Sequence, residues 1–171
     1  LENIVYFKEP QNDGKEYARF LGLKGGKRCY YWARKDYHEL PDSFFTYKVF
    51  IPAANGSGAL GEVLSTPLIG EPLIGATETF LTVGPLQTKT EAEDCLKYVK
   101  SKFARVMLGV LKVTQHNPKS KWKYVPLQDF TNHSDIDWSQ SIHDIDLQLY
   151  RKYGLDQKEI DFIETHVKEM A

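Results

Sequence analysis

The segment between residues 88 and 112 constrains the fold most, because it has the pattern of a long amphipathic helix. Thr88 and Thr90 are each followed three residues later by a glutamate, which is the arrangement of a capping box. Apolar side chains then recur every three or four residues, at Ala92, Cys95, Leu96, Val99, Phe103, Val106, Met107 and Val110. We therefore predict a helix over residues 89–112, roughly 35 Å long at ~1.5 Å per residue.

Basic residues occupy the other side of this predicted helix. Lys97, Lys102, Arg105 and Lys112 alternate with the apolar positions, so we expect them to lie opposite the buried face. Two interpretations of the wider basic stretch over residues 97–123 stay open at this point. It forms either an ordinary solvated face with a polar turn or part of a surface that binds a polyanion.

The remaining segments predict a mixed α/β body followed by helices. Strand-forming residues and turn signals favour strands over residues 29–33, 44–51, 78–83 and 122–126. Residues 15–21 are expected to form one or two helical turns, and residues 67–75 a loop. Two more helices are predicted, over residues 139–153 and after a capping box at Asp156 and Glu159. The predicted fold class is α+β, with a mixed sheet packed by the long helix and a C-terminal helical pair. A body over residues 1–130 and an appendage over residues 131–171 form the predicted domain organisation.

Composition excludes several classes of protein. Of 171 residues, 42% are hydrophobic and 26% charged, which excludes a disordered chain, a collagen-like rod and a coiled coil. The mostly apolar run over residues 63–76 is interrupted by Pro67, Glu71 and Pro72, so no membrane span is expected. Two cysteines are too few for a disulfide scaffold, and a reducing cytoplasm is the expected location. Because the chain begins at Leu1 and not at methionine, we expect a fragment of a longer protein.

Charge is distributed unevenly behind a net charge of −1. Residues 97–123 contain eight lysines and arginines and no acidic residue, whereas residues 129–171 contain ten acidic and four basic residues. This asymmetry points to a polyanionic partner for the body. Ten carboxylates beside DNA would repel its phosphates. We therefore expect residues 131–171, the acidic tail, to lie away from a duplex. The tail would either complete the core or dock other parts of the parent chain.

Motifs for catalysis and for metal or cofactor binding are missing from the sequence. It contains neither a glycine-rich phosphate loop nor the nucleophile and zinc-protease motifs, and its five histidines lack ligand spacing. We therefore predict no catalytic residue, no metal site and no cofactor in this chain. Whether the chain belongs to an enzyme is not decided by these residues alone.

A loop after the long helix carries the best candidates for reading DNA. Thr114, Gln115, His116 and Asn117 can bond to base edges. Lysines follow, interleaved with Trp122 and Tyr124, and can meet phosphates. A small-residue loop over residues 53–61 provides polar groups, and an earlier segment provides a second basic margin. The predicted DNA-binding residues are Lys24, Lys27, Arg28, Arg34, Lys35, Asn55, Ser57, Thr114, Gln115, His116, Asn117, Lys119, Lys121 and Lys123.

Several strings resemble one known family. They are TFLTVGPLQTKTEAE (79–93), YVKSKF (98–103), LKVTQH (111–116), KYVPLQDF (123–130), DIDW (135–138) and LYRKYGL (149–155). Residues 47–168 resemble the C-terminal target-recognition region of bacterial adenine-N6 DNA methyltransferases in type II restriction–modification systems, including single-chain enzymes that also cleave DNA. The resemblance implies an upstream catalytic domain that binds S-adenosylmethionine and methylates an adenine. This chain would hold duplex DNA and select its sequence.

Two other functions remain as alternatives. A protein-interaction domain would dock an acidic partner through the basic body, or a basic partner through the acidic tail. A self-contained nuclease would need two or three carboxylates to converge near one lysine. A single concave basic face about as wide as a duplex would favour DNA binding over protein interaction, and the lack of such a carboxylate cluster would remove the nuclease.

Overall fold

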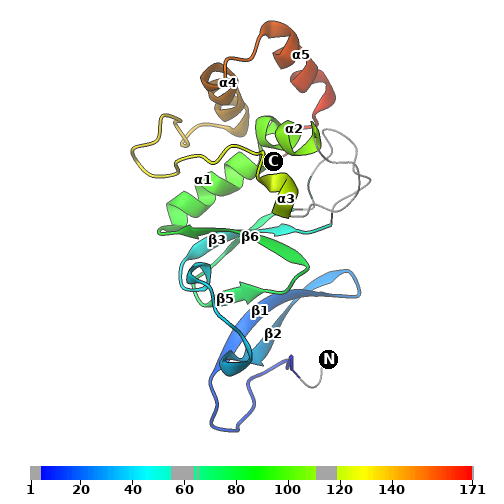
Figure 1. Cartoon of the computed structure of the whole chain (residues 1–171), viewed down its shortest axis with the longest axis vertical. Helices are drawn as coiled ribbons and strands as arrows, with labels where there is room; N and C mark the ends of the chain where they lie inside the picture. Colours follow the sequence, from blue (N-terminus) through cyan, green and yellow to red (C-terminus); the bar gives the residue numbers. More distant parts are fainter. Residues whose placement is uncertain (1–4, 55–63, 65, 111–118, 171) are drawn as a thin grey trace.

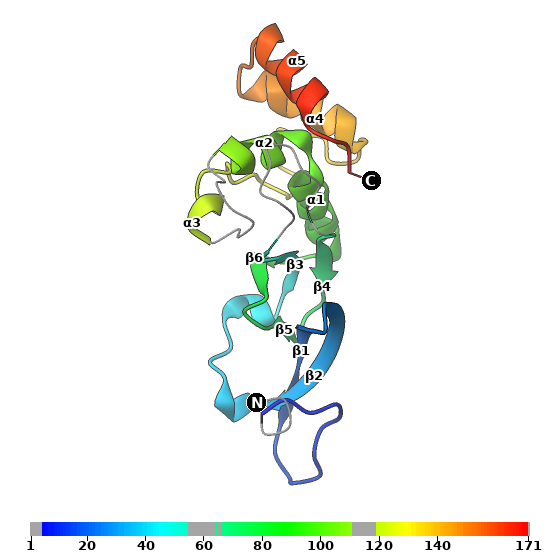
Figure 2. The same cartoon turned by 90° about the vertical axis from the view of Figure 1, so that its right-hand side faces the viewer.

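The protein is elongated, with two small sheets and a group of helices stacked in series (Figures 1 and 2). The structure, a computed structural model, describes residues 5–54, 64, 66–110 and 119–170. These residues form five α-helices and two three-stranded sheets, which confirms the predicted α+β class. Two 3-10 helices, Lys35–Tyr37 and Asp42–Phe44, connect the first sheet to the second. Within the described ranges no helix has both the length and the apolar character that crossing a membrane requires.

The first sheet consists of β1 (Tyr17–Lys24), β2 (Lys27–Arg34) and β5 (Ile74–Ala76), in the order β2-β1-β5. β1 and β2 form an antiparallel hairpin, while β5 pairs with β1 in parallel. Gly25 and Gly26 make the turn with φ values of 56° and 75°, a left-handed conformation that glycine adopts without strain. The expected helical turns over residues 15–21 are wrong. Ala18 and Phe20 are buried on either side of the exposed Arg19, which is the alternation of a strand.

The second sheet consists of β4 (Leu68–Gly70), β3 (Tyr47–Pro52) and β6 (Phe80–Leu86), antiparallel and in the order β4-β3-β6. Strands predicted near β2, β3 and β6 are confirmed, but one mixed sheet was expected and two are present. The loop expected over residues 67–75 contains β4 and β5. Each has only three residues, too few for a period of two to be visible in the sequence.

Buried Lys48 of β3 joins the two sheets. Its ammonium donates to the carbonyl oxygens of Phe44, at 3.0 Å, and of Ile74 in β5, at 2.9 Å. Burial lowers the pKa of this lysine to about 8. Gly70 of β4 leaves room for the side chains of Lys48 and Phe50. A Cβ atom at this position would lie 2.8 Å from Lys48 Cγ and 2.4 Å from the Phe50 ring.

The long helix predicted over residues 89–112 is instead two helices, α1 (Lys89–Lys100) and α2 (Lys102–Val110). Ser101 separates them with ψ of 150°, and its hydroxyl accepts a hydrogen bond from Ala104 N at 3.1 Å as a new helix cap. The predicted cap of α1 is confirmed, because Thr88 Oγ1 accepts from Glu91 N at 3.1 Å.

Asp146 explains why the helix breaks at this point. Its carboxylate is 1% exposed and accepts hydrogen bonds from Lys102 N, at 3.0 Å, and from Phe103 N, at 2.8 Å. A continuous helix would have used both N–H groups internally. Asp146 lies on α4 (Ile142–Lys152), which precedes α5 (Gln157–His166). Both C-terminal helices were predicted, and the capping box that begins α5 at Asp156 is confirmed.

Two of the basic residues expected opposite the buried face of the long helix, Lys102 and Arg105, are instead buried against the C-terminal part of the chain. Lys102 is 6% exposed and its ammonium lies 2.5 Å from the Glu164 carboxylate. Arg105 is 3% exposed and donates to the carbonyl oxygens of Lys100 and Lys168. Lys97 donates to Trp138 O at 2.5 Å. The expectation that these cations lie opposite the buried face is therefore wrong for α2, since the acidic tail packs directly against them.

Apolar packing divides into one large core and two small ones. The large core joins α1, α2, α4, α5 and the second sheet, and includes Val49, Phe103, Leu149 and Ile163. Smaller clusters form on the two sides of the first sheet, around Phe20 and around Leu21. The C-terminal helices thus share the core of α1 and α2, and the boundary predicted at residue 130 remains a prediction.

Replacing Asp146 with alanine should destabilise the fold strongly. It leaves two buried N–H groups without an acceptor and removes a carboxylate that interacts with Arg105, at an expected cost of about 3 kcal/mol. Urea unfolding at pH 7 measures this loss. Exposed Asp161 on α5 is the matched control, and Asp161→Ala should cost less than about 0.5 kcal/mol. Equal losses in both variants would contradict the capping role.

Stability should also depend on pH through Asp146. Burial raises the pKa of its carboxyl to about 6, above its value in the unfolded chain. A carboxyl with a raised pKa stabilises the fold fully below about pH 4, and this contribution is lost as pH rises through 6. The free energy of unfolding, measured relative to Asp146→Asn, should therefore fall by about 2 kcal/mol between pH 4 and 7. A difference that stays constant over this range would contradict the expectation.

Candidate nucleic-acid interface

The predicted DNA-binding residues fall into three groups in the structure. Six of them, which include both base-reading sets, lie outside the described residues: Asn55, Ser57, Thr114, Gln115, His116 and Asn117. Lys119, Lys121 and Lys123 belong to α3 (Lys119–Trp122) or follow it directly. Residues 122–126 were predicted as a strand, which is wrong, because α3 ends at Trp122 and irregular chain follows.

The second basic margin is divided between the two ends of β2. Lys24, Lys27 and Arg28 surround the hairpin turn and are exposed. Arg28 donates to the carbonyl oxygen of Thr66, and its guanidinium carbon lies 5.9 Å from the centroid of the Phe80 ring. These contacts hold the Arg28 side chain against the end of β6.

Arg34 and Lys35 lie about 23 Å from the hairpin turn, at ~3.3 Å per strand residue. Each has an acidic partner. Arg34 Nε donates to Asp36 Oδ1 at 2.9 Å, and Lys35 Nζ lies 3.0 Å from Glu16 Oε2. The Arg34 guanidinium keeps the pKa of the Asp36 carboxyl below its usual value. The structure thus separates these two residues from the basic group at the turn.

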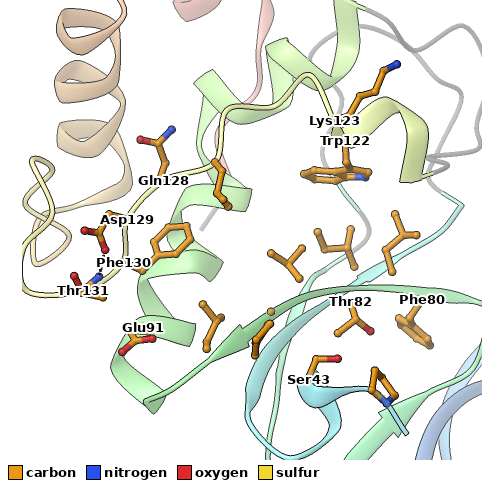
Figure 3. A pocket seen from close by; sticks show the side chains of 18 residues that line it. Ser43, Phe80, Thr82, Glu91, Trp122, Lys123, Gln128, Asp129, Phe130 and Thr131 are labelled. Atoms are coloured by element: carbon orange, nitrogen blue, oxygen red, sulfur yellow. Dashed lines mark hydrogen bonds between the residues drawn. The ribbon is translucent and has the colours of Figure 1, made fainter. Parts of the chain in front are cut away.

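Helix α3 presents cations and aromatic rings in alternation. Lys121 is half-buried, and Lys123 is exposed with its ammonium 4.7 Å from the centroid of the Tyr124 ring. Tyr124 is 49% exposed. The Trp122 indole points the other way, over the second sheet (Figure 3), and its Nε1 is buried without a hydrogen-bond partner among the described residues. Trp122 therefore faces inward, while Lys123 and Tyr124 after it face solvent.

A cavity of about 930 Å³ extends along β6, an edge strand of the second sheet, from α3 to Pro41 and Ser43. Trp122 lies on the helix side of β6, whereas Phe80 and Thr82 project from the opposite side of the strand (Figure 3). The cavity is lined by Pro41, Ser43, Ile51, Phe80, Leu81, Thr82, Val83, Gly84, Pro85, Leu86, Glu91, Trp122, Lys123, Leu127, Gln128, Asp129, Phe130 and Thr131. Arg28, next to the hairpin turn, packs on Phe80, which lines this cavity.

Acidic residues lie at the opposite end of this cavity. Glu91 and Asp129 lie beside α1, away from Lys123 and Phe80 (Figure 3). Asp129 Oδ1 accepts a hydrogen bond from Thr131 N at 2.8 Å, which lowers the pKa of its carboxyl. Glu91 accepts from Gln87 N at 2.8 Å. Both carboxylates therefore accept hydrogen bonds from backbone N–H groups of neighbouring residues. Within the part of the chain that the structure describes, no three His, Cys, Asp or Glu side chains are grouped to hold a metal ion.

We name five residues the cationic rim: Lys24, Lys27, Arg28, Lys121 and Lys123. Lys123 lines the cavity, Lys121 adjoins Trp122 and Arg28 packs on Phe80, while Lys24 and Lys27 flank the hairpin turn beside Arg28. Sequence reasoning missed Phe80, Thr82 and the inward role of Trp122. Phe80 and Thr82 are separated by one residue in a strand that was predicted, so their shared face could have been found from the period of two.

Comparison of the chain with protein-family models, with curated proteins and with solved structures finds no match. A function for this chain must therefore rest on its own residues and geometry.

Basic residues of the rim should be dispensable for folding, unlike those of α2. Arg28→Ala removes one bond to Thr66 and a contact with Phe80 at an exposed site, so we expect a loss of about 1 kcal/mol or less. Lys102→Ala removes a buried partner of Glu164 and should cost about 3 kcal/mol. Thermal and urea unfolding of both variants test this contrast. A larger loss for Arg28→Ala than for Lys102→Ala would show that the assignment of surface and core is wrong.

Proposed function

We propose that this chain is the DNA sequence-recognition domain of a restriction–modification enzyme. In this proposal it holds duplex DNA while other domains of the same polypeptide methylate an adenine, with S-adenosylmethionine bound to those domains. The parent would be a site-specific adenine-N6 DNA methyltransferase or type II restriction enzyme. Only the family resemblance, and no residue of this chain, suggests that the parent also cleaves DNA.

The observation that carries the proposal is the separation of two kinds of cation. Lys102 and Arg105 are buried with the tail, whereas the cationic rim remains at the surface. The tail's Asp146 and Glu164 pack on α2 and face inward. Helices α4 and α5 lie at one end of the molecule and the β1–β2 hairpin at the other (Figure 1). A duplex that contacts the rim would therefore lie away from these carboxylates, as electrostatic attraction requires.

The rim has the chemistry of contacts to the DNA backbone. Lysine and arginine bind phosphates and fix the register of a protein on a duplex without reading bases. In this proposal the bases are read by the polar residues that the sequence predicts just before α3 and just after β3. Gln115 and Asn117 are the main candidates. Glutamine and asparagine can bond to both N6 and N7 of adenine in the major groove. Tyr124, exposed beside Lys123, adds a ring that can pack against the sugar or a base.

Titration of the chain against random-sequence duplex DNA tests this proposal. Wild type should bind in low salt, and its affinity should fall steeply with salt as counterions are released. Lys121→Ala combined with Lys123→Ala should weaken binding to all sequences alike and reduce the salt slope by about 0.9 for each lost phosphate contact. Lys35→Ala is the matched control, because Glu16 already neutralises that lysine, and it should change little.

Substitutions at the predicted reading residues should behave differently. After selection of a preferred sequence, Gln115→Ala or Asn117→Ala should alter base preference by about 1–3 kcal/mol while leaving the salt slope unchanged. Unaltered preference in both variants would contradict their assignment. Absence of DNA binding by wild type in low salt would contradict the whole proposal and favour a protein-interaction domain.

A further inference from the structure

A second basic and aromatic surface lies on the β1–β2 hairpin. In this antiparallel pair, Arg19 lies opposite Trp32, Leu21 opposite Tyr30, and Leu23 opposite Arg28. Side chains directly opposite each other point to the same face of a sheet, and so do alternate residues along each strand. These six residues therefore share one face, which we name the hairpin face: Arg19, Leu21, Leu23, Arg28, Tyr30 and Trp32.

The hairpin face is exposed along most of its length. Tyr30 and Leu23 are each 40% exposed, Arg19 and Arg28 are also exposed, and Trp32 is half-buried. Leu21 alone is buried, against Phe50 and Phe80. Exposed tyrosine, tryptophan and arginine together are enriched at binding surfaces and depleted on ordinary solvated ones.

Arg19 is held in a defined position on this face. Its guanidinium carbon lies 4.2 Å from the centroid of the Tyr30 ring, a cation–π contact that keeps the guanidinium plane on the ring. The six positions of the face include no acidic residue, and among the described residues no carboxylate pairs with Arg19. The next pair on the same side of the hairpin, Tyr17 and Arg34, contacts Asp13 and Asp36 and is therefore neutralised. The six positions of the hairpin face thus present positive charge whose nearest counter-charges lie beyond its end.

Continuity with the cationic rim indicates which anion this charge meets. Arg28 belongs to both surfaces, since it lies on the hairpin face and also packs on Phe80 at the cavity. Leu21 and Phe80 lie in one apolar cluster, so the face adjoins β6. Arg19 lies opposite Trp32, four residues along β2 from Arg28, about 13 Å at ~3.3 Å per residue. That distance corresponds to about four base pairs of duplex at ~3.4 Å each.

We propose that the hairpin face, through Arg19 positioned by Tyr30, binds the phosphate backbone of duplex DNA that flanks the recognised sequence. This inference rests on the proposed function and extends it, because it assigns to the sheet a segment of DNA that the cationic rim does not reach. Arg19 contributes affinity and no base preference, since its contacts are to phosphates. Tyr30 is a positioning residue that keeps the guanidinium flat and extended.

Fluorescence-anisotropy titrations of random-sequence duplexes of about 25 base pairs, at several salt concentrations, test the inference. Arg19→Ala should raise Kd about threefold to tenfold in low salt and lower the salt slope by about 0.9, as expected for one phosphate contact. Arg151→Ala, at an exposed arginine on α4 far from the hairpin, is the matched control and should leave both quantities unchanged.

Conservative variants separate charge from packing. Arg19→Lys keeps the charge and should restore the salt slope with part of the affinity. Tyr30→Phe keeps the ring and should bind as wild type does, whereas Tyr30→Ala should weaken binding less than Arg19→Ala. Thermal unfolding confirms that each variant is folded before it is titrated.

The outcomes distinguish this inference from the proposed function. If wild type binds and Lys121→Ala with Lys123→Ala weakens binding, while Arg19→Ala behaves like Arg151→Ala, the hairpin face does not bind DNA and the proposed function stands. If Arg19→Ala weakens binding as expected, both stand. If wild type does not bind duplex DNA in low salt, the proposed function fails and this inference fails with it.

Discussion

The hydrogen bonds of the buried Asp146 carboxylate are the interaction on which the arrangement of the helices depends. It binds the first two N–H groups of α2 and so allows the chain to break at Ser101 and change direction. The same residue brings α4 against α2, where Ile145 and Leu149 enter the large core. One side chain thus interrupts what would otherwise be a single long helix. It also attaches the C-terminal helices to the rest of the fold.

This packing changes the meaning of the charge distribution. Ten acidic residues in the tail and eight basic residues in the preceding stretch look like two opposed surfaces in the sequence. In the structure the two sets partly neutralise each other, since Lys102 of the basic stretch pairs with Glu164 of the tail. Within the tail itself, Lys152 pairs with Asp135 at 2.7 Å. Of the basic stretch, Lys123 is exposed and Lys121 half-buried beside α3. The charge of this stretch is therefore less exposed than the sequence suggests.

Local signals in the sequence predicted helix starts well and long-range effects poorly. Thr88 and Asp156 begin helices because their side chains meet backbone groups only three residues away. The break at Ser101 could not be predicted, since its cause lies 45 residues further on, at Asp146. β4 and β5 were missed because three residues show no period. β1 was missed although Ala18 and Phe20 alternate with Arg19, and that error also hid the face that carries Arg19. At the candidate site, the sequence identified Lys121, Lys123 and Arg28 but grouped them with Arg34 and Lys35, because separation along a strand is invisible until the hairpin is known.

Three separate apolar clusters have a consequence for how the chain can diverge. The hairpin rests on small clusters around Phe20 and Leu21, while the helices and β3 share the large one. A substitution on the exposed side of β1 or β2 therefore perturbs few buried neighbours. It should leave the packing of the helices unchanged. Selection on the hairpin would act mainly through what it touches outside the molecule. Among related chains, we expect the exposed hairpin positions to drift quickly under a change of ligand, while the positions around Phe103 and Leu149 stay fixed by packing.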